Sequence, residues 1–187
     1  HSWGGVLVNS FLVRFPEHID MIERMVFFGA KRQVLVWNAH KAVFIDLVWK
    51  FLCRRSALRR GYLDARALRL GSDNESVKSH LHCATWASPS AWIDPDDGFD
   101  YAAAAKRADL PPVLYLAGAG DRSLGHPSDV KVFMEESGAR RAGYRILGKK
   151  YGSLRNYGHV DMLTHPDCEC DHFPGVIAWL NGGPFGD

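Results

Sequence analysis

Three short runs of the chain are almost continuously apolar, and glycine or loop residues follow them. They lie near residues 24–28, 112–117 and 143–147, and only the third is interrupted by a charge, at Arg145. Runs of this length without polar alternation are typical of parallel strands whose two faces are both covered by helices. Right-handed crossovers would place such strands side by side, with their carboxyl ends at one edge of a sheet.

The segments between these runs carry apolar residues at helical spacing. Residues 6–14 form the first such segment, which ends before Pro16. Further helices are predicted over residues 101–108, 127–137 and 167–180, with Pro174 near the first turn of the last, where the missing N–H is tolerated. Strands and helices in this order predict an α/β fold with helices flanking a parallel sheet.

Residues 30–108 differ from the rest of the chain in the spacing of their apolar residues and in their arginine content. Apolar residues recur at helical spacing over residues 43–52 and again over residues 57–68, where arginines surround them. We therefore predict a mainly helical cap inserted at residues 30–108. The core would consist of residues 1–29 and 109–187.

The net charge of +2 conceals a local basic region. Residues 30–70 hold ten Lys and Arg but only two acidic residues, Asp46 and Asp64. A nucleic-acid partner is not predicted, because interleaved aromatic residues and a recognisable binding motif are missing, and solvated helix faces account for the arginines. The longest apolar candidate for a membrane span, Ala42 to Cys53, is broken by Asp46 and Lys50.

Neither a metal nor a cofactor is predicted. The clusters His165–His172 and His80–Cys83 do not have the usual spacing of zinc ligands. Gly118-Ala119-Gly120 follows a strand but lacks the third glycine of a dinucleotide loop. The four cysteines show no disulfide spacing, which favours a reducing, cytoplasmic compartment.

Three residues are candidates for nucleophilic catalysis. Ser2 lies in His1-Ser2-Trp3-Gly4-Gly5, just before the first helix, and a strained turn there needs a small residue at Gly4. Asp121 follows Gly118 at the end of the second strand, although a turn-capping aspartate would have the same pattern. His159 follows Gly158 in a loop beyond the third strand.

Two further patterns leave alternatives open. Asp129 lies near the start of the predicted helix 127–137, where N-capping or first-turn charge explains it. Trp86 and Trp92 could line an acyl pocket or could anchor the end of the cap on the core.

Together HSWGG, VLYLAGAGD and GHVD resemble the α/β-hydrolase family, in which the triad follows the chain order serine, acid, histidine. The resemblance extends over nearly the whole chain and implies a partial α/β-hydrolase fold that starts at the nucleophile elbow, G-x-S-x-G. The elbow's first glycine would precede His1, so His1 and Gly4 are its remaining turn residues. The resemblance implies that Ser2 is the nucleophile, His159 the base and Asp121 the acid. The backbone N–H of Trp3 would belong to the oxyanion hole.

The function implied is that of a serine hydrolase acting on a small carboxylic ester, without metal or cofactor. Thioesterase, carbon–carbon hydrolase and acyltransferase activities remain open, as does a non-catalytic binding protein of the same fold. The oligomeric state is not predicted. The strand before the serine and the family's second oxyanion donor would lie upstream of His1. We therefore expect the isolated 187 residues to be a poor enzyme, with Ser2 less securely placed than the Asp121–His159 pair.

Overall fold

The computed structural model describes residues 1–185 apart from residues 70 and 72. The chain divides into two compact units, the first made of His1–Arg32 with Trp92–Asp187 and the second of Gln33–Ala91. Each unit is considered by itself below. Within the described part of the chain, no helix has both the length and the apolar character needed to cross a bilayer.

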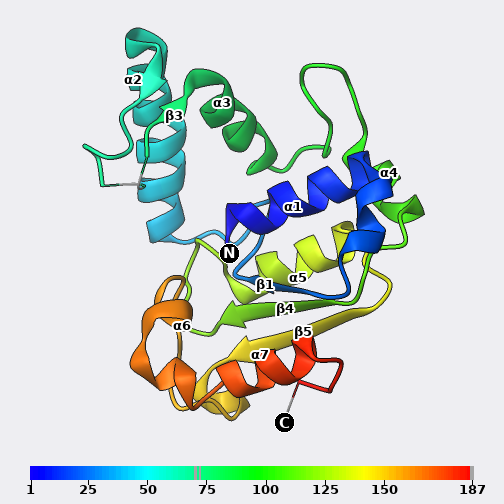
Figure 1. Ribbon diagram of the computed structural model, residues 1–187. Helices are drawn as coiled ribbons and strands as arrows, with labels where there is room; N and C mark the ends of the chain where they lie inside the picture. The colour runs from blue at the N-terminus through cyan, green and yellow to red at the C-terminus, as the bar shows by residue number, and fades with distance from the viewer. Residues whose placement is uncertain (70, 72, 186–187) are drawn as a thin grey trace. The chain divides into compact units, whose positions relative to one another are not determined.

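The first unit is built on a parallel three-stranded sheet. Its strands are β1 (Met25–Phe28), β4 (Val113–Gly118) and β5 (Ala142–Leu147), in the order β1-β4-β5 (Figure 1). Met25 pairs with Val113, and Val113 in turn pairs with Ala142. All six residues of the central strand β4 are buried, as its unbroken apolar sequence predicts. The α/β fold class and the three strands predicted from the sequence are confirmed.

Helices cover both faces of this sheet. Tyr115 on β4 contacts Phe27 of β1 edge to face and also lies against Phe133 of α5 (Pro127–Glu136), while Gly5 of α1 (Trp3–Arg14) lies close to Phe27. On the opposite face, Leu114 and Leu116 form a core cluster with residues of α7 (Phe173–Leu180). The alternation of side chains along β4 therefore assigns α1 and α5 to one face and α7 to the other.

The remaining elements of the first unit are short. They are η1 (Pro16–Met21), α4 (Tyr101–Arg107), η3 (Lys149–Tyr151), α6 (Asp161–Thr164) and η4 (Pro166–Glu169). The last predicted helix, 167–180, is therefore divided: η4 ends at Glu169 and α7 begins at Phe173. Pro174 lies in the first turn of α7, where its missing N–H breaks no helical hydrogen bond.

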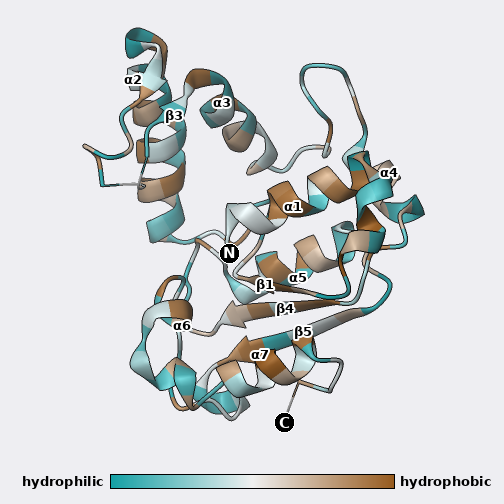
Figure 2. Ribbon diagram, viewed as in Figure 1, coloured by the Kyte–Doolittle hydropathy of each residue, from teal (hydrophilic) through white to brown (hydrophobic). Residues whose placement is uncertain are grey.

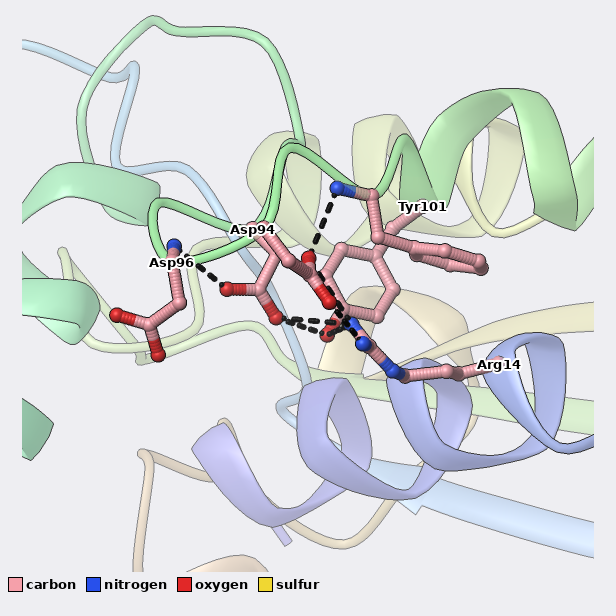
Figure 3. Close-up of polar contacts among 6 residues, drawn as sticks. Arg14, Asp94, Asp96 and Tyr101 are labelled. Carbon is pink, nitrogen blue, oxygen red and sulfur yellow. Dashed lines mark hydrogen bonds and ion pairs between the residues drawn. The ribbon is translucent and has the colours of Figure 1, made fainter.

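Arg14, at the end of α1, connects that helix to the turn before α4. Its guanidinium donates to Asp94 at 3.0 Å and to the hydroxyl of Tyr101 at 3.3 Å, and it also pairs with Asp97 (Figure 3). The Tyr101 hydroxyl donates to Asp94 at 2.8 Å, and the backbone N–H of Asp96 donates to the other oxygen of Asp94 at 3.0 Å. Segments 80 residues apart in the sequence are thus held together by polar contacts.

Trp92 belongs to the core of the first unit. Its ring is 1% exposed and lies 5.6 Å from that of Tyr101 and 5.7 Å from that of Phe133. This packing places residues 92–108 in the first unit, whereas the cap predicted from the sequence extended over residues 30–108. Trp92 is thus a core residue of the first unit.

The second unit, Gln33–Ala91, is mainly helical. It contains a π-helix η2 (Lys41–Cys53) that continues into α2 (Arg54–Arg60), and then α3 (Val77–Trp86). Two short strands, β2 (Tyr62–Leu63) and β3 (Glu75–Ser76), pair antiparallel and were not predicted from the sequence. Cys53 and Ala57 pack with Leu63 and Ala65 in a small core of the unit.

Candidate active site

Ser2 lies immediately before α1, at the carboxyl end of β1. Its backbone N–H donates to the carbonyl of Phe28 at 2.8 Å, and Gly29 continues the sheet by donating to Leu116 at 2.7 Å. The φ of Ser2 is +53° with ψ −127°, a conformation that costs a non-glycine residue on the order of 1–3 kcal/mol. Ser2 therefore occupies a strained turn between the sheet and the start of a helix.

The three residues proposed from the sequence as a triad are joined by two hydrogen bonds. Nε2 of His159 lies 2.8 Å from Oγ of Ser2, and Nδ1 lies 2.6 Å from Oδ2 of Asp121. The tautomer protonated at Nδ1 satisfies both bonds, because Nδ1–H then donates to the carboxylate and Nε2 accepts from the hydroxyl. Ser2 is thus held at both its backbone and its hydroxyl, and the expectation that it would be less securely placed than the other two residues was wrong.

Asp121 is buried in the loop between β4 and α5. Its Oδ1 accepts the backbone N–H groups of Ser123 at 3.2 Å and Leu124 at 2.9 Å. Burial raises the pKa of this carboxyl, but the hydrogen bond and charge of His159 together with the loop N–H groups outweigh it, so the net pKa is lowered. The carboxylate is therefore held ionised beside the imidazole.

Two glycines, Gly125 and Gly29, lie against the Asp121–His159 pair, and neither contact was predicted from the sequence. A Cβ at Gly125 would lie 2.8 Å from Oδ2 of Asp121 and 2.9 Å from Nδ1 of His159. A Cβ at Gly29, whose φ is +57°, would lie 3.1 Å from the imidazole of His159. The approaches of both glycines to His159 join positions far apart in the chain, so only the folded structure reveals them.

His1 also contacts His159, at both the backbone and the ring of that residue. Its Nε2 lies 2.9 Å from the backbone carbonyl of His159, and the two rings are 4.6 Å apart at an interplanar angle of 44°. The elbow residue before the serine therefore packs against the histidine that Ser2 contacts.

The steric requirement expected at Gly4 falls on Gly5 instead. A Cβ at Gly4 would meet nothing within 4 Å apart from its own helix and chain neighbours, whereas one at Gly5 would lie 2.6 Å from Cβ of Ala30 and 3.3 Å from the ring of Phe27. At Gly5, α1 packs so closely on Phe27 and Ala30 that a Cβ does not fit without a shift. Gly4 occupies the motif position of a turn glycine, but no close contact requires glycine there.

Alanine substitutions should separate these two neighbouring glycines. Gly4→Ala is expected to stabilise the protein by up to about 1 kcal/mol, because alanine favours a helix. Gly5→Ala is expected to destabilise it by about 1–3 kcal/mol, because Phe27 and Ala30 must move. Thermal unfolding of both variants measures the difference, and equal melting temperatures would contradict the close packing at Gly5.

Asp129 and the histidine and cysteine clusters take structural positions. Asp129 lies in the first turn of α5, as its alternative interpretation held. His172 binds the carbonyl of Met162 through Nε2 at 2.8 Å, and Cys168 donates to the carbonyl of Asp161 at 3.2 Å. Among residues 1–69, 71 and 73–185, no three His, Cys, Asp or Glu side chains gather in a set suited to a metal ion.

The comparisons with known proteins find similarity among solved structures only. No protein-family model and no curated protein sequence matches the chain. Among solved structures, the chain is similar to the carboxylesterase CesB (YbfK) of Bacillus subtilis, with 18% sequence identity and a TM-score of 0.45. The match covers 97% of this chain but 58% of that protein, so the chain spans less than two thirds of its length. A functional assignment therefore depends on the geometry of the chain's own residues.

Proposed function

We propose that the protein is a serine hydrolase of the α/β-hydrolase type that cleaves a carboxylic ester through an acyl-enzyme. The observation that supports this most directly is the hydrogen-bonded series Ser2, His159, Asp121, with Oγ to Nε2 at 2.8 Å and Nδ1 to Oδ2 at 2.6 Å. A hydroxyl, an imidazole and a buried carboxylate in this order are the groups that general-base activation of a serine requires.

Each group has a defined role in the proposed reaction. Oγ of Ser2 attacks the acyl carbon while Nε2 of His159 accepts its proton and then returns it to the leaving alcohol. Asp121 keeps the imidazole in the productive tautomer and stabilises the imidazolium. Water then attacks the acyl-enzyme with His159 again as base, which releases the acid and restores Ser2.

In the proposed reaction, the start of α1 stabilises the tetrahedral intermediate. Trp3 is the first residue of that helix and follows the nucleophile directly, so we assign its backbone N–H to the oxyanion hole. The positive end of the helix dipole favours negative charge at the same place. The N–H groups of Gly4 and Gly5 donate to the carbonyls of His1 and Ser2 at 3.0 and 3.1 Å, which closes the first turn.

A serine nucleophile restricts the class of bond that is cleaved. It excludes reactions that pass through an alkyl ester of an enzyme carboxylate, because Ser2 carries no carboxylate. Hydrolysis of thioesters or carbon–carbon bonds and acyl transfer can use the same serine nucleophile and are the alternative reactions. A non-catalytic binding protein of the same fold is the alternative of a different class. The cap expected at residues 30–108 stays a prediction from the sequence.

An activity-based probe tests this proposal. A fluorophosphonate should label the protein at Ser2, because only a serine activated by a base reacts rapidly with it, and Ser2→Ala should not be labelled. Ser128→Ala is a matched control, since Ser128 is an exposed serine at the start of α5. Absence of labelling would support the non-catalytic alternative, and labelling that survives Ser2→Ala would show that Ser2 is not the reactive nucleophile. Turnover of p-nitrophenyl acetate against its thioester analogue then distinguishes an esterase from a thioesterase.

A further inference from the structure

The continuous helix η2–α2 of the second unit is apolar on its exposed side as well as on its packed side. Its packed side contributes the buried residues Ile45, Cys53 and Ala57. The side facing solvent carries six large apolar residues, each between 47% and 57% exposed: Val43, Phe44, Leu47, Phe51, Leu52 and Leu58. Figure 2 shows apolar bands along this helix, from its lower end up to the α2 label. Solvation alone does not account for such a face, because large apolar patches on protein surfaces mark interaction sites.

An exposed tryptophan precedes the helix. Trp37 is 77% exposed and lies four residues before Lys41, where η2 begins. Tryptophan combines a large apolar ring with a polar N–H and is enriched where one side of a molecule meets lipid and the other meets water. Trp37 therefore adds a highly exposed aromatic ring just before the N-terminal end of the helix.

The same helix is strongly basic. Residues 41–60 contain six Lys or Arg and one acid, Asp46. Lys41 and Lys50 both pair with Asp46, at 2.7 and 3.4 Å, so this carboxylate is already neutralised. The excess positive charge falls at the α2 end.

Three arginines of α2 share one hollow. The hollow has a volume of about 420 Å³ and is lined by Leu52, Arg55, Ser56, Arg59 and Arg60. Arg60 lies 3.7 Å from Asp64, whereas the ion pairs of the described residues include none for Arg55 or Arg59. Guanidinium groups around a hollow with one apolar wall suit a phosphate group attached to an apolar chain.

These features favour a lipid surface over other partners. A nucleic acid would leave Phe44, Leu47 and Phe51 in contact with water, since phosphate contacts do not bury aliphatic surface. A second copy of this chain would bury the apolar residues but would bring two identical arginine clusters together. An anionic bilayer satisfies both parts, because it takes up apolar side chains at its interface and attracts the arginines.

We propose that the face formed by Trp37, Phe44, Leu47, Phe51, Arg55 and Arg59 binds the surface of a membrane containing anionic phospholipids. The helix would lie in the plane of the interface, with its aromatic and aliphatic side chains among the acyl chains and its arginines on lipid phosphates. This binding does not depend on the proposed hydrolase activity, and the Ser2→Ala protein should show it unchanged.

Co-sedimentation of the full 187-residue chain with vesicles tests the proposal. Binding is expected to vesicles of phosphatidylcholine with 30% phosphatidylserine and to be much weaker with phosphatidylcholine alone. Arg55→Gln with Arg59→Gln should weaken partitioning by roughly tenfold to thirtyfold, the effect of two arginines near an anionic surface. Phe44→Gln with Phe51→Gln should weaken it by about tenfold, because two aromatic rings no longer enter the interface. Raising the salt concentration should lower binding to the anionic vesicles.

Matched variants in the first unit serve as controls. Lys149→Gln with Lys150→Gln removes the same charge from exposed positions, and Leu154→Gln removes an apolar side chain that is 56% exposed. Both should bind vesicles as the unaltered protein does, and circular dichroism should show that every variant is folded. Equal binding to neutral vesicles, or equal losses in the control variants, would overturn the proposal. So would a dimer, seen by sedimentation velocity, that dissociates in the Phe44 and Phe51 variant while no vesicle binding is observed.

Discussion

The Asp121→Asn variant is expected to lose about four orders of magnitude in kcat for an ester substrate while keeping its fold. The carboxamide is close in size to the carboxylate, so the bonds from Ser123 and Leu124 to Oδ1 can persist. A neutral amide cannot stabilise the imidazolium, and its NH₂ group facing Nδ1 would favour the tautomer that leaves Nε2 protonated. Nε2 could then no longer accept the Ser2 proton. Steady-state hydrolysis of p-nitrophenyl acetate measures the loss, with circular dichroism to show that the variant is folded.

Asp129→Asn is the matched control for this variant. Asp129 is also a buried aspartate, 2% exposed, but it lies in the first turn of α5 rather than against His159. Its kcat should stay within a few-fold of the unaltered protein. A large loss of kcat in Asp129→Asn with a small loss in Asp121→Asn would contradict the proposed triad.

Acid titration gives an independent measure of the same carboxylate. The pKa of Asp121 is lowered by folding, so its ionised form contributes stability at pH values above the unfolded pKa of about 3.9. That contribution is lost as the pH falls through the lower folded-state pKa. The difference in unfolding free energy between the protein and Asp121→Asn should therefore shrink on acidification below about pH 4.

Gly125→Ala is expected to lower kcat by about a hundredfold, because it displaces the pair that orients His159. The new Cβ would lie 2.8 Å from Oδ2 of Asp121, 2.9 Å from Nδ1 of His159 and 2.8 Å from the carbonyl of Gly29. No real Cβ sits so close to three polar atoms, so the carboxylate and imidazole must shift, and a displacement of about 1 Å at a catalytic group can cost this much. Overpacking should also destabilise the protein by about 1–3 kcal/mol.

Gly71→Ala tests whether these losses are specific. The nearest atoms to a Cβ at Gly71 lie 3.7 Å away, an ordinary contact distance, so both kcat and melting temperature should change little. Kinetics and thermal unfolding of the two variants, measured in parallel, separate a displaced triad from a general effect of replacing glycine. A fully active Gly125→Ala would show that the Asp121–His159 bond tolerates displacement.

The strands could be predicted from the sequence because burial on both faces leaves a direct trace in it. Val113 to Ala117 is apolar at every position, and the structure buries all of them in the central strand. Arg145 interrupts the third run because β5 is at an edge of the sheet, where that side chain is exposed. The order of Ser2, Asp121 and His159 could also be proposed from the sequence, because Asp121 and His159 each follow a glycine and Ser2 lies two residues before one.

The contacts that surround the triad could not be predicted in the same way. Gly29 and Gly125 both lie close to the imidazole of His159, and contacts between residues so far apart in the chain have no local sequence pattern. Gly4 was expected to be the crowded position because the motif specifies it, but the folded helix turns Gly5 toward Phe27 and Ala30. The short β2–β3 pair was missed because two residues per strand are too few to show alternation.

The positive φ of Ser2 makes stability and activity favour different residues at this position. Glycine adopts φ near +53° without steric cost, so Ser2→Gly should fold at least as well as the protein with serine. Directed evolution that selects variants by heat resistance alone would therefore accumulate glycine at position 2 and discard the nucleophile. A library built from this sequence needs a screen for turnover at every round, because at this residue thermal selection rewards an inactive protein.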